Sequence, residues 1–257
     1  MLILLPPSES KTTPASGSPL NFDSLSSPNL NATRQDIAKN LIETAGRDDA
    51  LTILKVGPKL HDVVAKQTHL LSLPCAPARE IYTGVLFSAM ELQSACSTEL
   101  SFADEHILIF SALFGVLRPS DMIPPYRLSM GVTLPGFGNT KKVWKKELAS
   151  FSPDNSDVVI DCRSGNYRVW NPPVNSQHIS INAVREHNGE RKVISHNAKH
   201  FRGLLAKNLV KAQVDIQHPE ELLDFAVELI GSGHIDNAEL ISSGKNQWQL
   251  VLVQHED

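Results

Sequence analysis

Three short apolar runs, separated by long polar stretches, most constrain what this chain of 257 residues can fold into. They are LILL at 2–5, HILIFSALFGVL at 106–117 and DVVIDC at 157–162. None approaches the roughly 20 residues of a membrane span, so we predict no membrane segment, and each run suits a buried strand. Amphipathic helical patterns at 32–46 and 139–151 lie between the runs. This alternation predicts an α/β protein built around a central sheet.

Two hairpin signals indicate that the sheet is not all parallel. Asn188-Gly189 interrupts HISINAVREHNGERKVISH, and Asn-Gly between strand-like segments is a strong signal for a two-residue turn. Near the C-terminus, AELISS and QWQLVLVQ are joined by GKN, and they also predict an antiparallel pair. Strands and helices do not follow a strict βαβ order. We therefore predict a mixed (α+β) sheet wrapped by helices, in a single domain over 1–257.

Helix boundaries are marked by capping and breaking residues. Asn31 or Thr33 is expected to cap the helix at 32–46, and Gly46 is expected to end it. Segment 49–71 predicts two short helices that meet at KVGPK, with Gly57 ending the first and Pro58 starting the second. Two further helices are predicted at 198–212 and 219–231.

The net charge of −4 conceals an uneven distribution. Residues 1–115 carry 8 Lys/Arg and 12 Asp/Glu, residues 116–215 carry 15 and 8, and residues 216–257 carry 1 and 8. A basic middle can attract an anion although the whole molecule is acidic. Alternatively, the acidic C-terminal segment folds back and neutralises the basic one.

Composition and cysteine spacing favour an ordinary soluble protein of the cytoplasm. Hydrophobic residues make up 41% and charged residues 20%. Cys75, Cys96 and Cys162 form neither a disulfide framework nor a CxxC motif, so we predict buried, reduced thiols. His196 and His200 are four residues apart but have no third ligand nearby. No metal site and no cofactor is predicted.

Cationic and hydroxyl side chains recur just after predicted strands and at turns. Ligand sites of α/β proteins gather at strand ends, which makes these side chains candidates for one anion-binding site. The predicted anion-binding residues are Ser10, Lys11, Tyr82, Arg118, Tyr126, Arg127, Lys199 and Arg202.

The stretch RPSDMIPPYR at 118–127 carries most of this prediction. Its three prolines fix φ and stiffen the turn that holds Arg118 and Arg127. Arginine suits a planar anion such as phosphate or carboxylate, and the Tyr126 phenol can donate to it. Asp121 is expected to hold one guanidinium in place. The competing interpretation is an Arg118–Asp121 salt bridge that locks the turn with nothing bound.

Five blocks of the chain resemble those of the peroxide stress protein YaaA family. They are MLILLPPSESKT, YTG, SALFGVLRPSDMIPPYRLSMG, VVIDCRSGNY and HNAKHFRGLLAK, and they extend from residue 1 to about residue 212. The resemblance implies a cytosolic bacterial protein that resists hydrogen peroxide by limiting free iron. It also implies DNA binding and an unusual mixed α/β fold with a helix-hairpin-helix. Here ILKVGPKLHDVV looks like that hairpin, with Gly57 at its turn between Lys55 and Lys59.

Two functional classes follow. The first is a monomeric stress protein that holds DNA phosphates, without reading bases, through this hairpin and the four lysines of KKVWKK, Lys141, Lys142, Lys145 and Lys146. Trp144 on the same helix is expected to turn toward the core. The second is an enzyme for a small phosphate-bearing molecule or nucleotide, with Lys11 or Tyr82 as the proton-transfer group. Burial of the arginines in a pocket would favour the second class.

Overall fold

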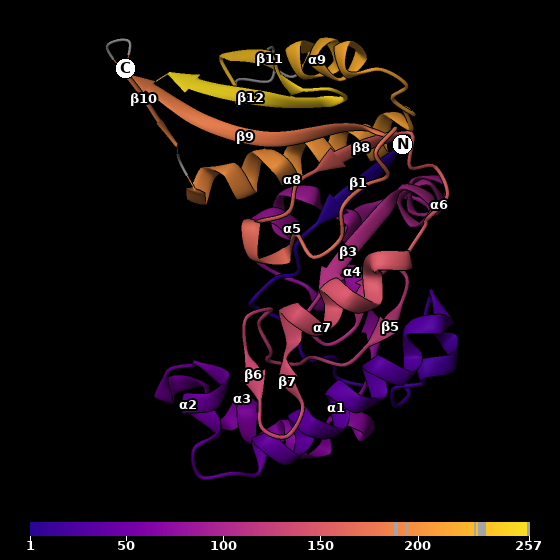
Figure 1. The fold of residues 1–257 in the computed structure, drawn as a ribbon, viewed down its shortest axis with the longest axis vertical. Helices are drawn as coiled ribbons and strands as arrows, with labels where there is room; N and C mark the ends of the chain where they lie inside the picture. Colours follow the sequence, from indigo (N-terminus) through magenta and orange to yellow (C-terminus); the bar gives the residue numbers. More distant parts are fainter. Residues whose placement is uncertain (188–189, 194, 229, 231–234, 256–257) are drawn as a thin grey trace.

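One mixed sheet runs through the molecule, and the computed structural model describes residues 1–187, 190–193, 195–228, 230 and 235–255 (Figure 1). In spatial order the strands are β11 (Asn237–Gly244), β12 (Gln247–His255), β9 (Gln177–His187), β8 (Val158–Asp161), β1 (Leu2–Leu5), β3 (Ile107–Ser111) and β4 (Gly115–Leu117), and β10 (Glu190–Val193) also pairs with β9. The central strands β12, β9, β8, β1 and β3 are mutually parallel, whereas β11, β10 and β4 pair antiparallel. The predicted mixed α/β fold is confirmed.

The central strand β1 positions the loops that follow the strands. Ile3 pairs with Ile107 on one side and with Ile160 on the other, and all three are fully buried. A strand covered on both faces reads as a continuous apolar run, which is why LILL was recognisable. Because the three strands are parallel, Ser111 of β3 and Asp161 of β8 lie at the same edge of the sheet as the end of β1.

Helices surround this sheet. They are α1 (Asn31–Ala45), α2 (Ala50–Leu54), α3 (His61–Lys66), α4 (Ala78–Ile81), α5 (Val85–Met90), α6 (Ser97–His106), α7 (Thr140–Glu147), α8 (Ser195–Ala212) and α9 (Pro219–Glu228). Short two-stranded ribbons join β2 (Ala76–Pro77) to β5 (Met122–Ile123) and β6 (Thr133–Leu134) to β7 (Gly138–Asn139). In the part of the chain that is described, no helix is long and apolar enough to cross a bilayer.

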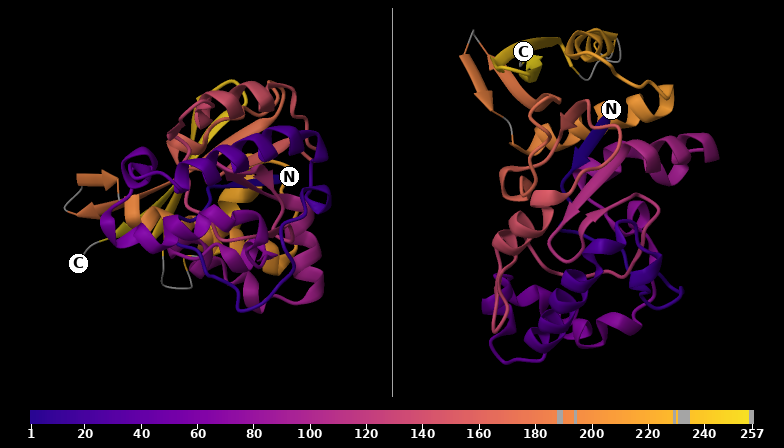
Figure 2. Two further views of the ribbon diagram at one scale, coloured as in Figure 1. Left: turned by 90° about the horizontal axis from the view of Figure 1, so that it is seen from below. Right: turned by 45° about the vertical axis from the view of Figure 1, so that its right-hand side comes forward.

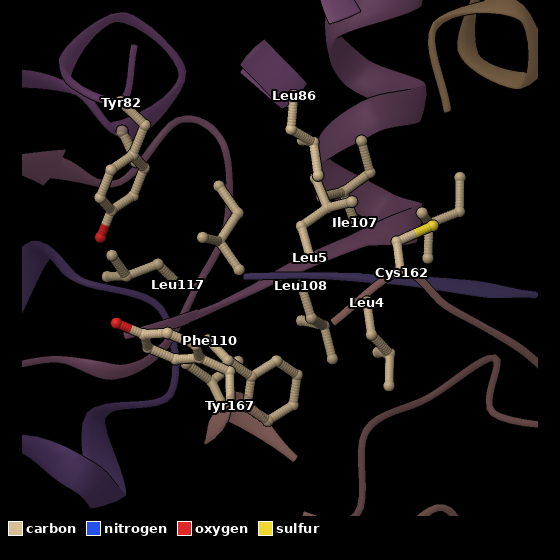
Figure 3. Packing of buried hydrophobic residues seen from close by; sticks show 14 of the residues in the cluster. Leu4, Leu5, Tyr82, Leu86, Ile107, Leu108, Phe110, Leu117, Cys162 and Tyr167 are labelled. Atoms are coloured by element: carbon tan, nitrogen blue, oxygen red, sulfur yellow. The ribbon is translucent and has the colours of Figure 1, made fainter. Parts of the chain in front are cut away.

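The molecule is elongated, and its two ends are built from different parts of the chain (Figures 1 and 2). The C-terminal elements β11, β12 and α9 lie together at one end. The helices α1, α2 and α3 and the ribbon β6–β7 lie at the other end. Between them, Leu4, Leu5, Ile107 and Leu108 pack in the core around β1 and β3 (Figure 3).

Several local predictions need correction. The N-cap of α1 is Leu30, with no side-chain cap, because the Asn31 amide instead donates to the Phe22 carbonyl. The helix α2 ends at Leu54, and the left-handed residue after it is Lys55 (φ 56°) rather than Gly57 (φ −77°).

The apolar run 106–117 is not one strand but the hairpin β3–β4. Cys96 is exposed, whereas Cys75 and Cys162 are buried as predicted. The tip of the predicted Asn188-Gly189 hairpin lies outside the described residues, but β9 and β10 on either side pair antiparallel as predicted. The helix predicted at 198–212 begins three residues earlier, and the helix predicted at 219–231 is described to Glu228.

Candidate functional site

Lys11 lies in the loop after β1, and this loop pairs directly with the segment around Tyr82. Lys11 and Tyr82 form a β-bridge, and the Thr12 N–H donates to the Ile81 carbonyl over 2.9 Å. The residue is half-buried, but its ammonium end is enclosed. Nζ donates to the Ser8 carbonyl at 2.7 Å. It also lies 4.2 Å from the centre of the Tyr126 ring and 5.4 Å from that of Tyr82.

This environment makes the Lys11 amine unusually weak as a base. Burial lowers its pKa from 10.5 to about 7, because an ammonium loses its hydration inside the protein. The carboxylate of Glu9 opposes this shift and the guanidinium of Arg127 adds to it. Near neutral pH a large fraction of Lys11 is therefore the free amine.

A chain of three hydroxyl groups lies beside Lys11. The Tyr126 hydroxyl is 2.7 Å from Ser111 Oγ and 2.8 Å from the Tyr82 hydroxyl. Ser111 Oγ already accepts from the backbone N–H groups of Leu113 and Phe114, so its own hydrogen points to Tyr126. Burial raises the pKa of both phenols, which keeps them protonated.

Tyr167 is the third and last tyrosine of the sequence. It is buried by the same part of the core as Tyr82 (Figure 3). Burial raises its pKa as well, and the neighbouring Tyr126 adds to the effect.

A cavity of about 260 Å³ opens beside Lys11. Of the predicted anion-binding residues, Ser10, Lys11, Tyr126 and Arg127 line it. Tyr82 reaches it only through the hydrogen bond to Tyr126. The structure thus brings these four residues to the wall of one cavity.

Arg127 is held at the rim of this cavity. Its Nη1 donates to the Glu9 carbonyl at 2.9 Å, and its Nη2 lies 2.7 Å from the Glu9 carboxylate. Its backbone N–H donates to the Gln67 side-chain oxygen. The guanidinium is therefore preorganised, but much of its bidentate face is already taken by Glu9.

Besides Tyr82, three further predicted site residues do not line the cavity. Arg118 turns back to donate to the Glu105 carbonyl at 2.8 Å, near the end of α6. Arg202 donates twice to the Ile181 carbonyl, at 3.0 and 2.7 Å. Lys199 is exposed on α8 and is absent from the cavity wall. The prediction that Arg118 and Lys199 converge with Lys11 is wrong.

Asp121 does not hold a guanidinium either. Its carboxylate accepts from the backbone N–H of Arg118 at 2.8 Å and from the backbone N–H and hydroxyl of Ser26. It therefore ties the turn to the N-terminal loop, and the alternative of an Arg118–Asp121 salt bridge is wrong as well.

Asp161 forms a second buried polar cluster, which the sequence did not indicate. Arg163 donates to it through Nε and Nη2, both at 2.9 Å, and His178 Nε2 lies 3.2 Å away. Burial opposes ionisation of Asp161, but the hydrogen bonds from His178 and Arg163 outweigh it and hold the pKa of the carboxyl well below its usual range. The alternation Asp161-Cys162-Arg163 after a strand was the available signal, but spacing alone does not show that two neighbours pair.

Exposed lysines that do not line the cavity lie on the turn after α2 and on α7. Lys55, Gly57 and Lys59 are exposed around the turn after α2. On α7, Lys142, Lys145 and Lys146 are exposed, and Lys141 is half-buried. Trp144 is fully buried and donates to the Ala112 carbonyl at 2.8 Å, so the predicted core face of α7 is confirmed. The ribbon β6–β7 packs against both α2 and α7.

No group of three or more metal-ligating side chains gathers among the residues that are described. The structure thus defines an α/β protein with two basic features, an enclosed lysine beside a cavity and an exposed set of lysines. The chain belongs to the peroxide stress protein YaaA family, whose family model matches residues 1–229.

Similar proteins extend over the same length. A UPF0246 protein of Streptomyces coelicolor is 36% identical over 263 residues, covering 100% of this chain and 99% of the relative. A UPF0246 protein of Corynebacterium efficiens is 38% identical over 230 residues, covering 88% and 91%. One of Corynebacterium glutamicum is 36% identical with the same coverage. Family membership supports a role in the peroxide stress response.

Proposed function

We propose that this protein acts in the cytoplasm as a monomer that limits free iron during peroxide stress and binds DNA without sequence preference. Family membership supports the peroxide part of the proposal. The turn between α2 and α3 supports the proposal of DNA binding. It places exposed Lys55 and Lys59 on either side of exposed Gly57, in the manner of a helix-hairpin-helix.

Gly57 is the single observation that favours a phosphate at this turn. Its φ of −77° is accessible to any residue, and an added Cβ would meet nothing within 4 Å. The fold therefore gives no steric reason for glycine. A glycine at an open turn lets a phosphate strand approach the backbone closely, and flanking lysines supply the charge.

The lysines of α7 extend the same surface. The ribbon β6–β7 packs against both α2 and α7, so the helices that carry the two sets of lysines lie in the same half of the molecule (Figure 1). Within the described chain no ion pair engages the side chains of Lys141, Lys142, Lys145 or Lys146.

The test of DNA binding is its salt dependence. If the α7 lysines neutralise four phosphates, they contribute about −3.6 to the slope of log K against log salt. We expect the fourfold variant Lys141/Lys142/Lys145/Lys146→Ala to lose that contribution on a random duplex. Lys245→Ala, a surface lysine at the opposite end, should keep the wild-type slope. A fourfold variant with the wild-type slope would remove α7 from the interface.

The iron part is tested in the host. Deleting the gene should raise free iron, measured by electron paramagnetic resonance of whole cells, and should lower survival in hydrogen peroxide. Unchanged free iron together with unchanged survival would refute it.

A second function is favoured by Lys11. An open DNA-binding groove needs exposed cations, whereas the ammonium of Lys11 is buried beside a small cavity that has Arg127 at its rim and Glu9 as the one acidic residue among its described lining residues. We propose an enzyme, or a binding protein, for a small anion such as a phosphorylated molecule or nucleotide. Lys11 is the better proton-transfer group, because its amine titrates near neutral pH while the Tyr82 phenol stays protonated.

Melting temperature in the presence of phosphate or nucleotides tests this second function. A stabilising anion should lose its effect in Arg127→Met and keep part of it in Arg127→Lys, which retains the charge but not the planar fork. If no anion stabilises the wild-type protein, Arg127 only anchors Glu9, and the proposal of an anion site is wrong.

A further inference from the structure

Lys11 has more hydrogen-bonding capacity than its surroundings use. Its charged form has three N–H donors, but the Ser8 carbonyl is the one acceptor that the described residues supply. The remaining donors face two aromatic rings and the cavity. An amine in such a place is kept neutral more readily than a solvated one. A neutral lysine carries a lone pair and is a nucleophile.

The two closest charges act in opposite directions on the Lys11 pKa: the Glu9 carboxylate raises it and the Arg127 guanidinium lowers it, and the effect of Glu9 is the larger. Arg127 Nη2 lies 2.7 Å from the Glu9 carboxylate, so these two groups also pair with each other. The lowered pKa of Lys11 therefore comes from burial rather than from a neighbouring cation. Desolvation in an apolar pocket is itself a recognised way to activate a lysine as a nucleophile.

The cavity suits a short carbon chain with one anionic end. Leu60, Val63, Leu73 and Pro125 contribute apolar walls. Lys66 and Arg127 contribute positive charge. A volume of about 260 Å³ suits a small metabolite rather than a dinucleotide.

The hydroxyl chain has one hydrogen to spare. Ser111, Tyr126 and Tyr82 have three hydroxyl hydrogens but make only two hydroxyl–hydroxyl contacts. Ser111 must use its hydrogen toward Tyr126, and one tyrosine hydrogen links the two phenols. The other tyrosine hydrogen has no acceptor within the part of the chain that is described. When Tyr82 donates to Tyr126, the spare hydrogen belongs to Tyr126, which lines the cavity and can donate to an oxygen atom of a ligand.

We propose that Lys11 forms a reversible imine with an aldehyde or 2-oxo acid bound in this cavity. The nitrogen lone pair adds to the carbonyl carbon, the C=O π pair moves to oxygen, and a proton passes from nitrogen to that oxygen. The hydroxyl group then takes a second proton from solvent and departs as water while the C=N bond forms, and the nitrogen returns its remaining proton to solvent. No oxidant or reductant is consumed. The inference rests on the second proposed function and is independent of DNA binding.

The experiment traps the imine by reduction. Full-length protein is incubated at pH 7 with pyruvate and cyanoborohydride, and adducts are located by peptide mapping. At that pH a pKa of about 7 gives roughly a thousandfold more free amine than a solvated lysine. A weaker base is also a weaker nucleophile, so we expect Lys11 to react roughly tenfold faster than Lys66.

Two arginine variants provide the matched comparison. Lys11→Arg should give no cavity adduct, whereas Lys66→Arg, at the same cavity, should still be labelled at Lys11. The labelling rate at Lys11 should level off above pH 7, while surface lysines continue to accelerate. Equal melting temperatures of the two variants would show that both are folded; if Lys11→Arg is unstable, Lys11→Met replaces it.

Four results separate the possibilities. A single adduct at Lys11 that disappears in Lys11→Arg supports the imine. Adducts spread evenly over surface lysines overturn it. Stabilisation by pyruvate or phosphate without any adduct at Lys11 also overturns the imine but leaves the small-molecule site intact; absence of both effects removes the site itself.

Discussion

Replacing Lys11 by methionine should stabilise the protein at acidic and neutral pH. Methionine has nearly the shape of the lysine stem but carries no charge that must be desolvated. In the folded protein the lysine pKa is lowered from 10.5 to about 7. Between these values the unfolded chain holds more protons than the folded one. Wild-type stability therefore rises with pH across this window, and below about pH 7 the full cost of the buried charge is present.

The size of the effect follows from three terms. The difference between 10.5 and about 7 corresponds to about 5 kcal/mol as an upper bound. Cation–π contact of the ammonium with the Tyr126 and Tyr82 rings stabilises the wild type by about 1–2 kcal/mol and offsets part of this cost. Loss of the hydrogen bond to the Ser8 carbonyl costs the variant about 1 kcal/mol. We expect a net gain of about 2 kcal/mol at pH 6.

Urea denaturation of both proteins at several pH values measures this difference. The advantage of Lys11→Met should shrink between pH 7 and pH 10 and then change sign, since only the lost hydrogen bond remains. Lys66→Met, exposed on α3, should show no such pH dependence. A Lys11→Met variant that is less stable at pH 6, or whose stability difference does not change with pH, would refute the view of Lys11 as a buried, reluctantly charged amine.

Other positions give further tests by thermal and chemical denaturation. Asp161→Asn should cost about 3–5 kcal/mol, because it leaves the buried Arg163 without its carboxylate. In the wild type the pKa of Asp161 is lowered by folding, so this carboxylate stabilises the folded protein above pH ~3.9, and that stability is lost as the pH falls below this value. An Asp161→Asn variant that loses stability in acid as steeply as the wild type would contradict this role of Asp161. Gly115→Ala should cost about 3 kcal/mol, because φ is +72° and the new Cβ would clash with the Trp144 ring. Gly57→Ala, in open space, should change stability by less than about 0.5 kcal/mol, and equal losses for both glycines would show that contact with Trp144 is unimportant.

The sequence predicted the sheet better than its turns. β1 and β8 were recognisable because strands buried on both faces read as apolar runs. The hairpin β3–β4 was missed because Ala112, Leu113 and Phe114 carry no turn signal. That turn is stabilised from a distance: buried Arg34 donates to the carbonyls of Phe114 and Val116, 80 and 82 residues away. No local pattern reveals such a contact.

For a similar reason, only some of the residues that line the cavity could be predicted from the sequence. Lys11, Tyr126 and Arg127 were expected to meet because each follows or precedes a strand end. Position along the chain does not fix the direction of a side chain, however. The Arg118 side chain donates to a backbone carbonyl near the end of α6. The Arg127 guanidinium pairs with the carboxylate of Glu9, which is two residues from Lys11. Arginines are bound by whichever acceptors the fold brings near, and sequence spacing does not identify those acceptors.

The placement of the C-terminal elements decides which basic side chains the acidic segment can neutralise. The described part of segment 216–255 carries six Asp/Glu and one Lys, and it lies at the end opposite α2 and the ribbon β6–β7 (Figure 1). The acidic segment thus lies away from the turn after α2, and it packs instead beside β9, β10 and α8, which are rich in Lys and Arg (Figure 1). Arg191 of β10 pairs with the Glu239 carboxylate of β11 over 2.6 Å. The C-terminal segment therefore balances basic charge at its own end of the molecule and leaves the lysines of the turn after α2 without that compensation.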